Sequence, residues 1–284
     1  MHNNFSPLER LTRGLFLAFM LVWSVAPILF IVTSSFKRQV DIFVYPPKLL
    51  FMPTIDNYFK LMSQWQGFFT SLGNSMIVAL GATLLAGIVS FFGGYAYSRY
   101  RSRFMSWTAI YMIAVRVLPP IVVTLPLFPV ADTLGLSDTH LLLILLYATF
   151  WVSLNTMILK NFFDQIPSEL DEAAYVDGAS EWQLVTRILA RLTLQGMAAG
   201  SIFVFIYAWN EYLFAMIFTT NTAKTAPLIL SELMGAVDGT EWGVLFAGVT
   251  LQLVPVVLLN LSAPLSHRRT DRWCGEGLNG IGMS

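Results

Sequence analysis

Six long apolar runs constrain the fold of this chain more than any other feature. Each run is long enough to cross a bilayer, which takes about 20 residues. The runs cover residues 14–33, 75–97, 107–128, 141–159, 200–219 and 244–265. Only 12% of the 284 residues are charged, whereas soluble domains carry about 25%. We therefore predict an all-α membrane protein with six transmembrane helices, in which the first run is a retained span and not a cleaved signal peptide.

The distribution of Lys and Arg predicts the orientation of these spans, because cytoplasmic segments carry an excess of both. With the N-terminus inside, the cytoplasmic segments hold Arg10, Arg13, Arg99, Arg101, Arg103, Lys160, Arg187, Arg191, Arg268, Arg269 and Arg272. The external segments hold only Lys37, Arg38, Lys48, Lys60 and Lys224. We expect both termini to be cytoplasmic.

An acidic segment over residues 168–183 lies between two apolar runs, on the predicted cytoplasmic side. Ser168, with Asp171 three residues later, favours a helix start, and the acids of this first turn suit the helix dipole. Gly178 can adopt positive φ and end that helix. Ser180 and Gln183 have the spacing of a capping box for a second helix. The sequence predicts two short helices joined at a glycine, and we expect them to bind a partner outside the bilayer.

The same segment resembles a known family signature. Glu172-Ala173-Ala174-x-x-Asp177-Gly178-Ala179 is similar to the EAA loop of permease subunits of ABC importers. The resemblance implies one permease domain over residues 1–284, with a core at about 70–265 and a coupling loop at 168–190 that docks on a cytoplasmic ATPase. It implies coupling roles for Glu172, Ala173, Ala174, Asp177, Gly178, Ala179 and Trp182. The family usually has prolines where this chain has Arg191 and Gln195, so we expect a less kinked start of the next span.

Two charged residues lie inside the predicted spans, where charges are rare and often functional. Arg116 precedes Pro119-Pro120, which should bend the third span. It either lines or gates a pathway or forms a structural pair, and both interpretations stay open. We expect Arg116 and Glu211 to lie in the bundle interior or on the pathway.

A second resemblance concerns the segment around Glu211. Trp209-Asn210-Glu211-Tyr212 resembles the WNEF motif of sugar-type permeases. The resemblance implies stacking and hydrogen bonds to a sugar, although Glu211 could instead form a purely structural pair between helices. The candidate substrate-path residues are Arg116, Trp209, Asn210, Glu211 and Tyr212.

Two further patterns concern packing and the external segments. Ala82, Ala86, Ser90 and Gly94 recur every four residues, which predicts a close-packing helix face. Asp56-Asn57-Tyr58 predicts a turn before a short amphipathic helix and resembles a region of carbohydrate-type permeases. Residues 227–230 predict a short interfacial helix.

Several chemistries have no residues to support them. The chain has no Gly-Lys dipeptide and therefore no phosphate-binding loop, so it is not the ATPase of its own transporter. The only cysteine is Cys274, and the histidines His2, His140 and His267 lie outside the spans. We therefore expect no metal, no cofactor and no enzymatic activity. The net charge of zero gives no reason to expect a nucleic-acid partner.

Together these features predict a permease subunit of an ATP-driven importer for a sugar or polyol, in the inner membrane of a bacterial or archaeal cell. The implied partners are a second homologous permease, cytoplasmic ATPase subunits and an extracytoplasmic solute-binding protein. The alternative is a self-contained secondary transporter or channel. That class predicts inverted repeats and midplane carboxylates, of which only Glu211 fits.

Overall fold

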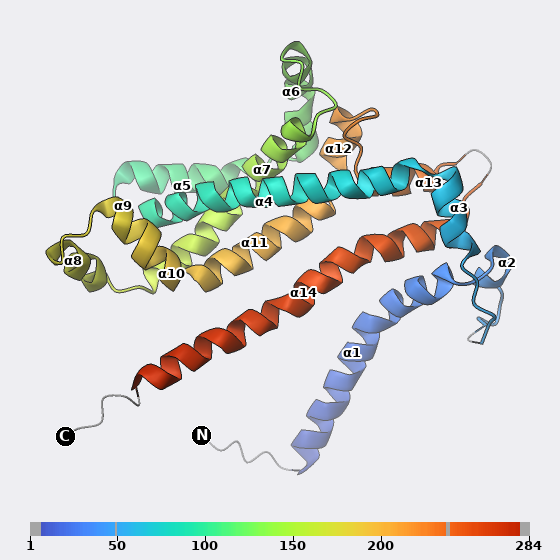
Figure 1. Ribbon diagram of the computed structural model, residues 1–284, viewed down its shortest axis with the longest axis horizontal. Helices are drawn as coiled ribbons and strands as arrows, with labels where there is room; N and C mark the ends of the chain where they lie inside the picture. The colour runs from blue at the N-terminus through green and yellow to red at the C-terminus, as the bar shows by residue number, and fades with distance from the viewer. Residues whose placement is uncertain (1–6, 49, 237–238, 279–284) are drawn as a thin grey trace. The chain divides into compact units, whose positions relative to one another are not determined.

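The computed structural model describes residues 7–48, 50–236 and 239–278, and all regular structure in these ranges is helical (Figure 1). This confirms the all-α prediction. His2 lies outside these ranges, and the side chains beyond residue 260, including His267 and Cys274, are not described. Contacts divide the chain into two units, residues 1–69 with 230–254 and residues 70–229 with 255–284.

The first unit contains α1 (Pro7–Ser35), α2 (Gln39–Ile42), α3 (Asp56–Gln64) and the start of α14 (Trp242–Leu278). The predicted helix after Asp56-Asn57-Tyr58 is α3. The amide of buried Asn57 donates to the carbonyls of Ser35 at 2.7 Å and Lys37 at 2.8 Å. Tyr58 shares a 2.8 Å hydrogen bond with the Ser35 hydroxyl. The motif therefore fixes the end of α1 on α3.

The second unit holds most of the remaining helices. They are α4 (Gly67–Arg99), α5 (Arg103–Val115), α6 (Pro120–Thr133), α7 (His140–Asp164), α8 (Glu169–Val176), α9 (Glu181–Gln183), η1 (Leu184–Leu189), α10 (Ala190–Leu192), α11 (Leu194–Trp209), α12 (Leu213–Phe218) and α13 (Ala226–Met234). Helix α4 begins and α13 ends in the first unit. Helix α13 confirms the short helix expected around residues 227–230.

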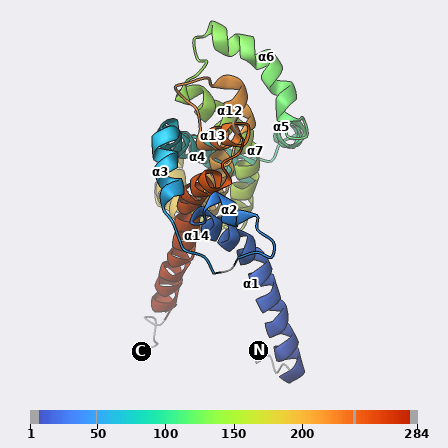
Figure 2. The same cartoon turned by 90° about the vertical axis from the view of Figure 1, so that its right-hand side faces the viewer.

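Among the residues that the structure describes, four helices are long and apolar enough to span a membrane by themselves. They are Leu11–Ser35 within α1, α4, α7 and Trp242–Asn260 within α14. Two bent helix pairs raise the number to six if each pair is one span. The expected bend after Arg116 is confirmed, because α5 ends at Val115, α6 begins at Pro120 and the two meet at 95° (Figures 1 and 2).

The fifth span differs from the prediction of a continuous run over residues 200–219. Helix α11 begins earlier, at Leu194, and ends at Trp209, and a break precedes the short α12. Polar side chains at the break bond the freed backbone groups: the amide of Asn210 donates to the Ile206 carbonyl at 2.7 Å. Hydropathy alone missed this break because the run stays apolar on both sides of it.

The small-residue face of α4 is a packing seam, as predicted, and its partner is α7. Ala82, Ala86 and Ser90 are fully buried, and the Ser90 hydroxyl donates to the Val152 carbonyl at 3.1 Å. A Cβ at Gly94 would lie 2.9 Å from the Leu159 Cβ, so only glycine allows the two backbones to come this close.

Candidate functional site

Residues 168–192 form a helical platform at the end of α4 where α5 begins (Figure 1). The platform consists of α8, α9, η1 and α10. Gly178 joins its two halves with φ of +80°, the left-handed conformation that favours glycine. Backbone bonds from Gly178 to Tyr175 at 3.0 Å and from Ala179 to Ala174 at 2.9 Å close the turn. The predicted glycine junction is confirmed.

The two helix starts of the platform differ in their caps. Ser180 and Gln183 form the predicted capping box, with bonds of 3.3 Å and 2.9 Å. The capping prediction for Ser168 is wrong, because its backbone is already helical and its side chain bonds no backbone group of α8. An N-cap needs extended backbone geometry, which Ser168 lacks.

Asp171 has a different role from the one expected at the helix start. Its carboxylate accepts a 2.6 Å bond from Nε of Arg99, the last residue of α4. Arg99 also donates to the carbonyls of Phe163 at 3.2 Å and Ile166 at 3.1 Å. The two charged side chains are only 14% and 11% exposed. This ion pair therefore holds α8 to both α4 and the end of α7.

Two aromatic contacts hold the second half of the platform. The Tyr100 hydroxyl donates to the Glu181 carboxylate, and this bond raises the pKa of the Tyr100 phenol because it favours the protonated form. The Trp182 indole stacks on the Phe92 ring of α4, with centroids 5.7 Å apart and planes 12° apart. Trp182 is nevertheless 66% exposed, so much of its surface is open to a partner.

The platform has one buried and one open face. Ala174, Leu184, Val185 and Leu189 pack into a core cluster that also contains Phe163. The open face carries Glu172, Ala173, Asp177 and Gly178, with Ala179 half-buried beside them. The sequence-predicted coupling residues are thus brought together, with Ala174 underneath.

The start of α11 is strongly bent, contrary to the expectation drawn from Arg191 and Gln195. The helical segments Glu181–Leu192 and Leu194–Trp209 meet at 76°. Buried Thr193 lies at the bend, and its hydroxyl donates to the Leu189 carbonyl at 2.8 Å. A threonine that bonds back to the preceding turn bends a helix, and the π-helical turn η1 precedes it. The bend needs no proline.

Arg116 lies at the break between α5 and α6 and lines a cavity of about 490 Å³. Its guanidinium lies 4.7 Å from the Trp151 ring centroid and 5.4 Å from that of Phe150. Nη1 is buried and has no hydrogen-bond partner among the described residues. Two aromatic rings stabilise this cation, and one donor stays available to a group that enters the cavity.

The four residues of the Trp209 motif have separate positions. Trp209 is 1% exposed and stacks on Phe205 at 5.7 Å, whereas Asn210 is exposed and Tyr212 is half-buried. The Glu211 carboxylate accepts from the amides of Phe214 at 3.0 Å and Ala215 at 3.4 Å. Glu211 therefore caps α12, and within the described residues it forms no ion pair with Arg116.

Comparison with known proteins adds the family. Residues 89–273 match the family described as binding-protein-dependent transport system inner membrane component. The chain belongs to this family. The permease is 33% identical over 231 residues to the probable ABC transporter permease protein y4oR of Sinorhizobium fredii, covering 81% of this chain and 82% of that protein. It is 30% identical over 244 residues to the trehalose/maltose transport system permease protein MalG of Thermococcus litoralis, covering 85% and 87%.

A solved structure shares the fold of this permease. It is a bacterial ABC transporter involved in the import of the acidic polysaccharide alginate. The TM-score is 0.74 at 19% identity, covering 93% of this chain and 98% of that one. The predicted family and fold are confirmed, and the family favours an importer permease over a self-contained secondary transporter.

Sequence reasoning missed the residues that hold the platform of the permease in place. The sequence predicted no contact with the platform for Phe92, Arg99 or Tyr100. Arg99 and Asp171 are 72 positions apart, and one sequence does not pair residues at that distance. The sequence held one signal for this ion pair. An arginine ends one span, and the loop contains more acidic residues than the start of a helix needs.

Proposed function

We propose that this chain is the membrane-spanning subunit of an ATP-driven importer for a sugar or polyol, and that it is not an enzyme. The observation that carries the proposal is the platform: an open face bearing Glu172 and Gly178, held rigidly to a long apolar helix. The family supports the importer class. The trehalose/maltose relative and the alginate transporter support the substrate class.

The platform passes force between an ATPase and the membrane helices. When two ATPase subunits close, they displace α8. The Arg99–Asp171 ion pair passes this displacement to α4, and the bonds of Arg99 to the Phe163 and Ile166 carbonyls pass it to the end of α7. Trp182 moves with Phe92 in the same way. The Arg99–Asp171 contact suits this role because it is buried and Arg99 makes several bonds at once.

The proposed assembly contains a second homologous permease, two ATPase subunits and an extracytoplasmic solute-binding protein. Each permease contributes half of the pathway.

We place the single permease domain in the inner membrane of a bacterium or archaeon with both termini cytoplasmic, as the Lys and Arg distribution indicates. A reporter fused after residue 60 should be external and one fused after residue 180 internal. The opposite result at either position overturns the orientation.

The substrate path includes Arg116, Trp209, Asn210, Glu211 and Tyr212, with different roles. Arg116 and Asn210 contact solute directly, because the first lines a cavity and the second is exposed. Trp209 and Glu211 shape the break between α11 and α12. Tyr212, beside that break, offers a ring and a hydroxyl to a sugar.

A pair of charge reversals tests the coupling role. Glu172→Lys reverses a charge on the open face of α8, and Glu169→Lys makes the same change one turn earlier, outside the motif. Both changes lose similar dipole stabilisation of about 0.3–1 kcal/mol. We expect only Glu172→Lys to lose ATPase co-purification and uptake while it still inserts into the membrane. Normal uptake by Glu172→Lys, or equal loss in both variants, contradicts the proposal.

A further inference from the structure

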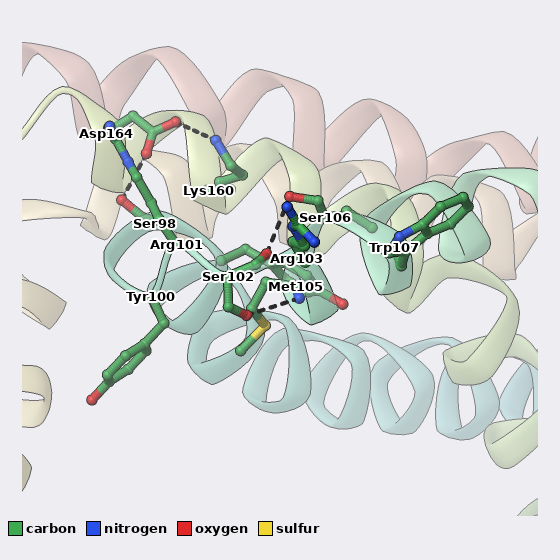
Figure 3. Close-up of a pocket in the computed structure, with 12 residues that line it drawn as sticks. Ser98, Tyr100, Arg101, Ser102, Arg103, Met105, Ser106, Trp107, Lys160 and Asp164 are labelled. Atoms are coloured by element: carbon green, nitrogen blue, oxygen red, sulfur yellow. Dashed lines mark hydrogen bonds and ion pairs between the residues drawn. The ribbon is translucent and has the colours of Figure 1, made fainter.

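A second cavity lies beside the platform, between the end of α4, the start of α5 and the end of α7 (Figure 3). Its volume is about 580 Å³. The lining residues come from α4, the loop after it, α5 and α7, and none belongs to the coupling or substrate-path residues discussed above. They are Tyr97, Ser98, Tyr100, Arg101, Ser102, Arg103, Met105, Ser106, Trp107, Ala109, Lys160 and Asp164.

This cavity carries excess positive charge. Arg101, Arg103 and Lys160 face a single carboxylate, Asp164, which leaves a net charge of +2. Asp164 is already bonded to Lys160 and, at 2.7 Å, to the Ser98 hydroxyl. Figure 3 shows Arg101 extending toward this acid. The Arg101 charge interacts with Asp164 at longer range. Among the described residues neither Arg101 nor Arg103 forms an ion pair or a side-chain hydrogen bond, so the N–H donors of both guanidinium groups are available to an anion.

The neighbouring surface of α5 is apolar and exposed. No residue of α5 is buried. Trp107 is 71% exposed and Phe104 is 73% exposed, within one turn of Arg103. Aromatic side chains beside arginine are typical of the boundary between a bilayer and water. The end of α4 and the start of α5 are ends of apolar helices, which puts the cavity at that boundary.

We infer that this cavity binds the headgroup of an anionic phospholipid. Guanidinium groups bind phosphate through paired hydrogen bonds, and Arg101 and Arg103 are the donors. The acyl chains lie along the exposed face of α5, on Trp107 and Phe104. A soluble phosphate would contact only the two arginines, whereas a phospholipid also contacts the apolar face of α5. The presence of both features favours a lipid over a free phosphate. The cytoplasmic leaflet is assigned on the proposed orientation; the binding itself needs only a membrane.

The site borders the platform. Arg101 also lines a neighbouring cavity of about 640 Å³ that includes Ser168 and Glu169. A lipid phosphate on Arg101 therefore lies close to the start of α8, the helix on which the proposed ATPase acts. The ATPase is the competing occupant for these arginines, and the experiment separates the two.

The test measures lipid bound to the permease purified with its co-expressed partner subunits. Phosphatidylglycerol and phosphatidylcholine with identical acyl chains are added, and bound lipid is counted by native mass spectrometry. The variants are Arg101→Gln, Arg103→Gln and the double variant. The matched control is Arg38→Gln with Lys60→Gln, two cationic side chains that are 67% and 46% exposed and lie outside both the cavity and the platform.

We expect phosphatidylglycerol affinity to fall about fivefold for each cavity arginine removed and about 25-fold for both. Phosphatidylcholine binding and the control should not change. Equal phosphatidylglycerol binding in wild type and double variant overturns the inference, as does equal loss in the control or displacement of the lipid by an equal concentration of inorganic phosphate. ATPase lost from the double variant with phosphatidylglycerol retained assigns the arginines to the ATPase instead. Co-purification and uptake report separately on the importer function.

Discussion

The guanidinium of Arg99 lies 2.6 Å from the carboxylate of Asp171 and joins the last residue of α4 to the platform. Because Arg99 also donates to two backbone carbonyls, its charge is well satisfied away from water. Removal of one partner from such a pair costs more than the pair contributes, since the remaining charge stays buried. The contact is therefore the point at which the platform is most easily detached.

Arg99→Gln should loosen the platform without unfolding the permease. The lost partner destabilises the α8 region by about 3 kcal/mol, which corresponds to about a hundredfold faster hydrogen exchange of its amides. Hydrogen exchange over residues 169–179 measures the effect.

A surface ion pair provides the control for Arg99. Lys60 bonds Glu241 at 2.6 Å, but both side chains are at least 40% exposed. Lys60→Gln should cost less than about 1 kcal/mol and leave exchange of the platform unchanged. Similar exchange in wild type and Arg99→Gln would show that the ion pair does not hold α8.

Gly178 should tolerate alanine better than valine. A Cβ at this position meets no atom within 4 Å, so the cost comes from the positive φ alone, about 1–2 kcal/mol for alanine. Valine costs more because a β-branched residue resists this conformation. Uptake and ATPase co-purification should decline in that order while the amount of permease in the membrane stays constant.

Gly73→Ala is the matched control, because its Cβ also meets nothing within 4 Å and Gly73 lies within helix α4 at no positive φ. Alanine there should be neutral or slightly stabilising. If Gly178→Val transports like wild type, the turn geometry has no part in coupling.

The sequence was most informative where local chemistry decides the structure. The glycine junction at Gly178, the box of Ser180 and Gln183, and the seam at Gly94 depend on neighbouring residues or on helical spacing. Each is confirmed by the structure. The helix break after Arg116 was also predictable, because Pro119-Pro120 acts locally.

Sequence reasoning failed where distant residues meet. Asp171 was expected to stabilise the start of α8, but its carboxylate accepts a hydrogen bond from Arg99, which belongs to another span. Arg191 and Gln195, which stand where the family usually has prolines, suggested a less kinked helix, yet Thr193 bends it by bonding back to Leu189. The break at Glu211 was hidden inside an apolar run, because hydropathy does not show which polar side chains cap a helix.

Arg116 and Glu211 should behave as independent sites. Arg116 contacts the rings of Phe150 and Trp151, while Glu211 bonds the backbone at the start of α12. The destabilisation caused by Arg116→Leu and Glu211→Gln should therefore add within about 0.5 kcal/mol. Thermal melting of the purified single and double variants measures this.

Trp151 provides the coupled comparison for Arg116. Trp151→Leu removes the ring that the guanidinium covers, so its combination with Arg116→Leu should cost less than the sum of the single changes, by about 0.5–2 kcal/mol. Recovery of stability in the Arg116→Leu and Glu211→Gln double variant would instead indicate that those two charges interact.

Asp138 should make the loop between α12 and α13 sensitive to acid. Its carboxylate accepts from the backbone amides of residues 220–223, at distances from 2.8 to 3.1 Å. Burial raises the pKa of Asp138, but these four amides more than offset it and hold the pKa well below the usual range. Folding thus lowers this pKa, so the stabilisation is present above the unfolded value of about 3.9 and declines as pH falls below it.

Asp138→Asn should lower stability by about 2 kcal/mol at pH 7, because the side-chain amide carries no charge and keeps only one of the two acceptor oxygens, the other being replaced by an NH2 group that cannot accept. Asparagine tolerates the φ of +57° at this position, so the backbone is kept and the comparison reports the loss of the charged, two-oxygen acceptor. Melting temperatures of wild type and variant, measured in detergent from pH 7 to pH 3, should differ most at neutral pH, and the difference should begin to shrink below about pH 4. A difference that stays constant across this range would mean that the carboxylate charge does not hold the loop.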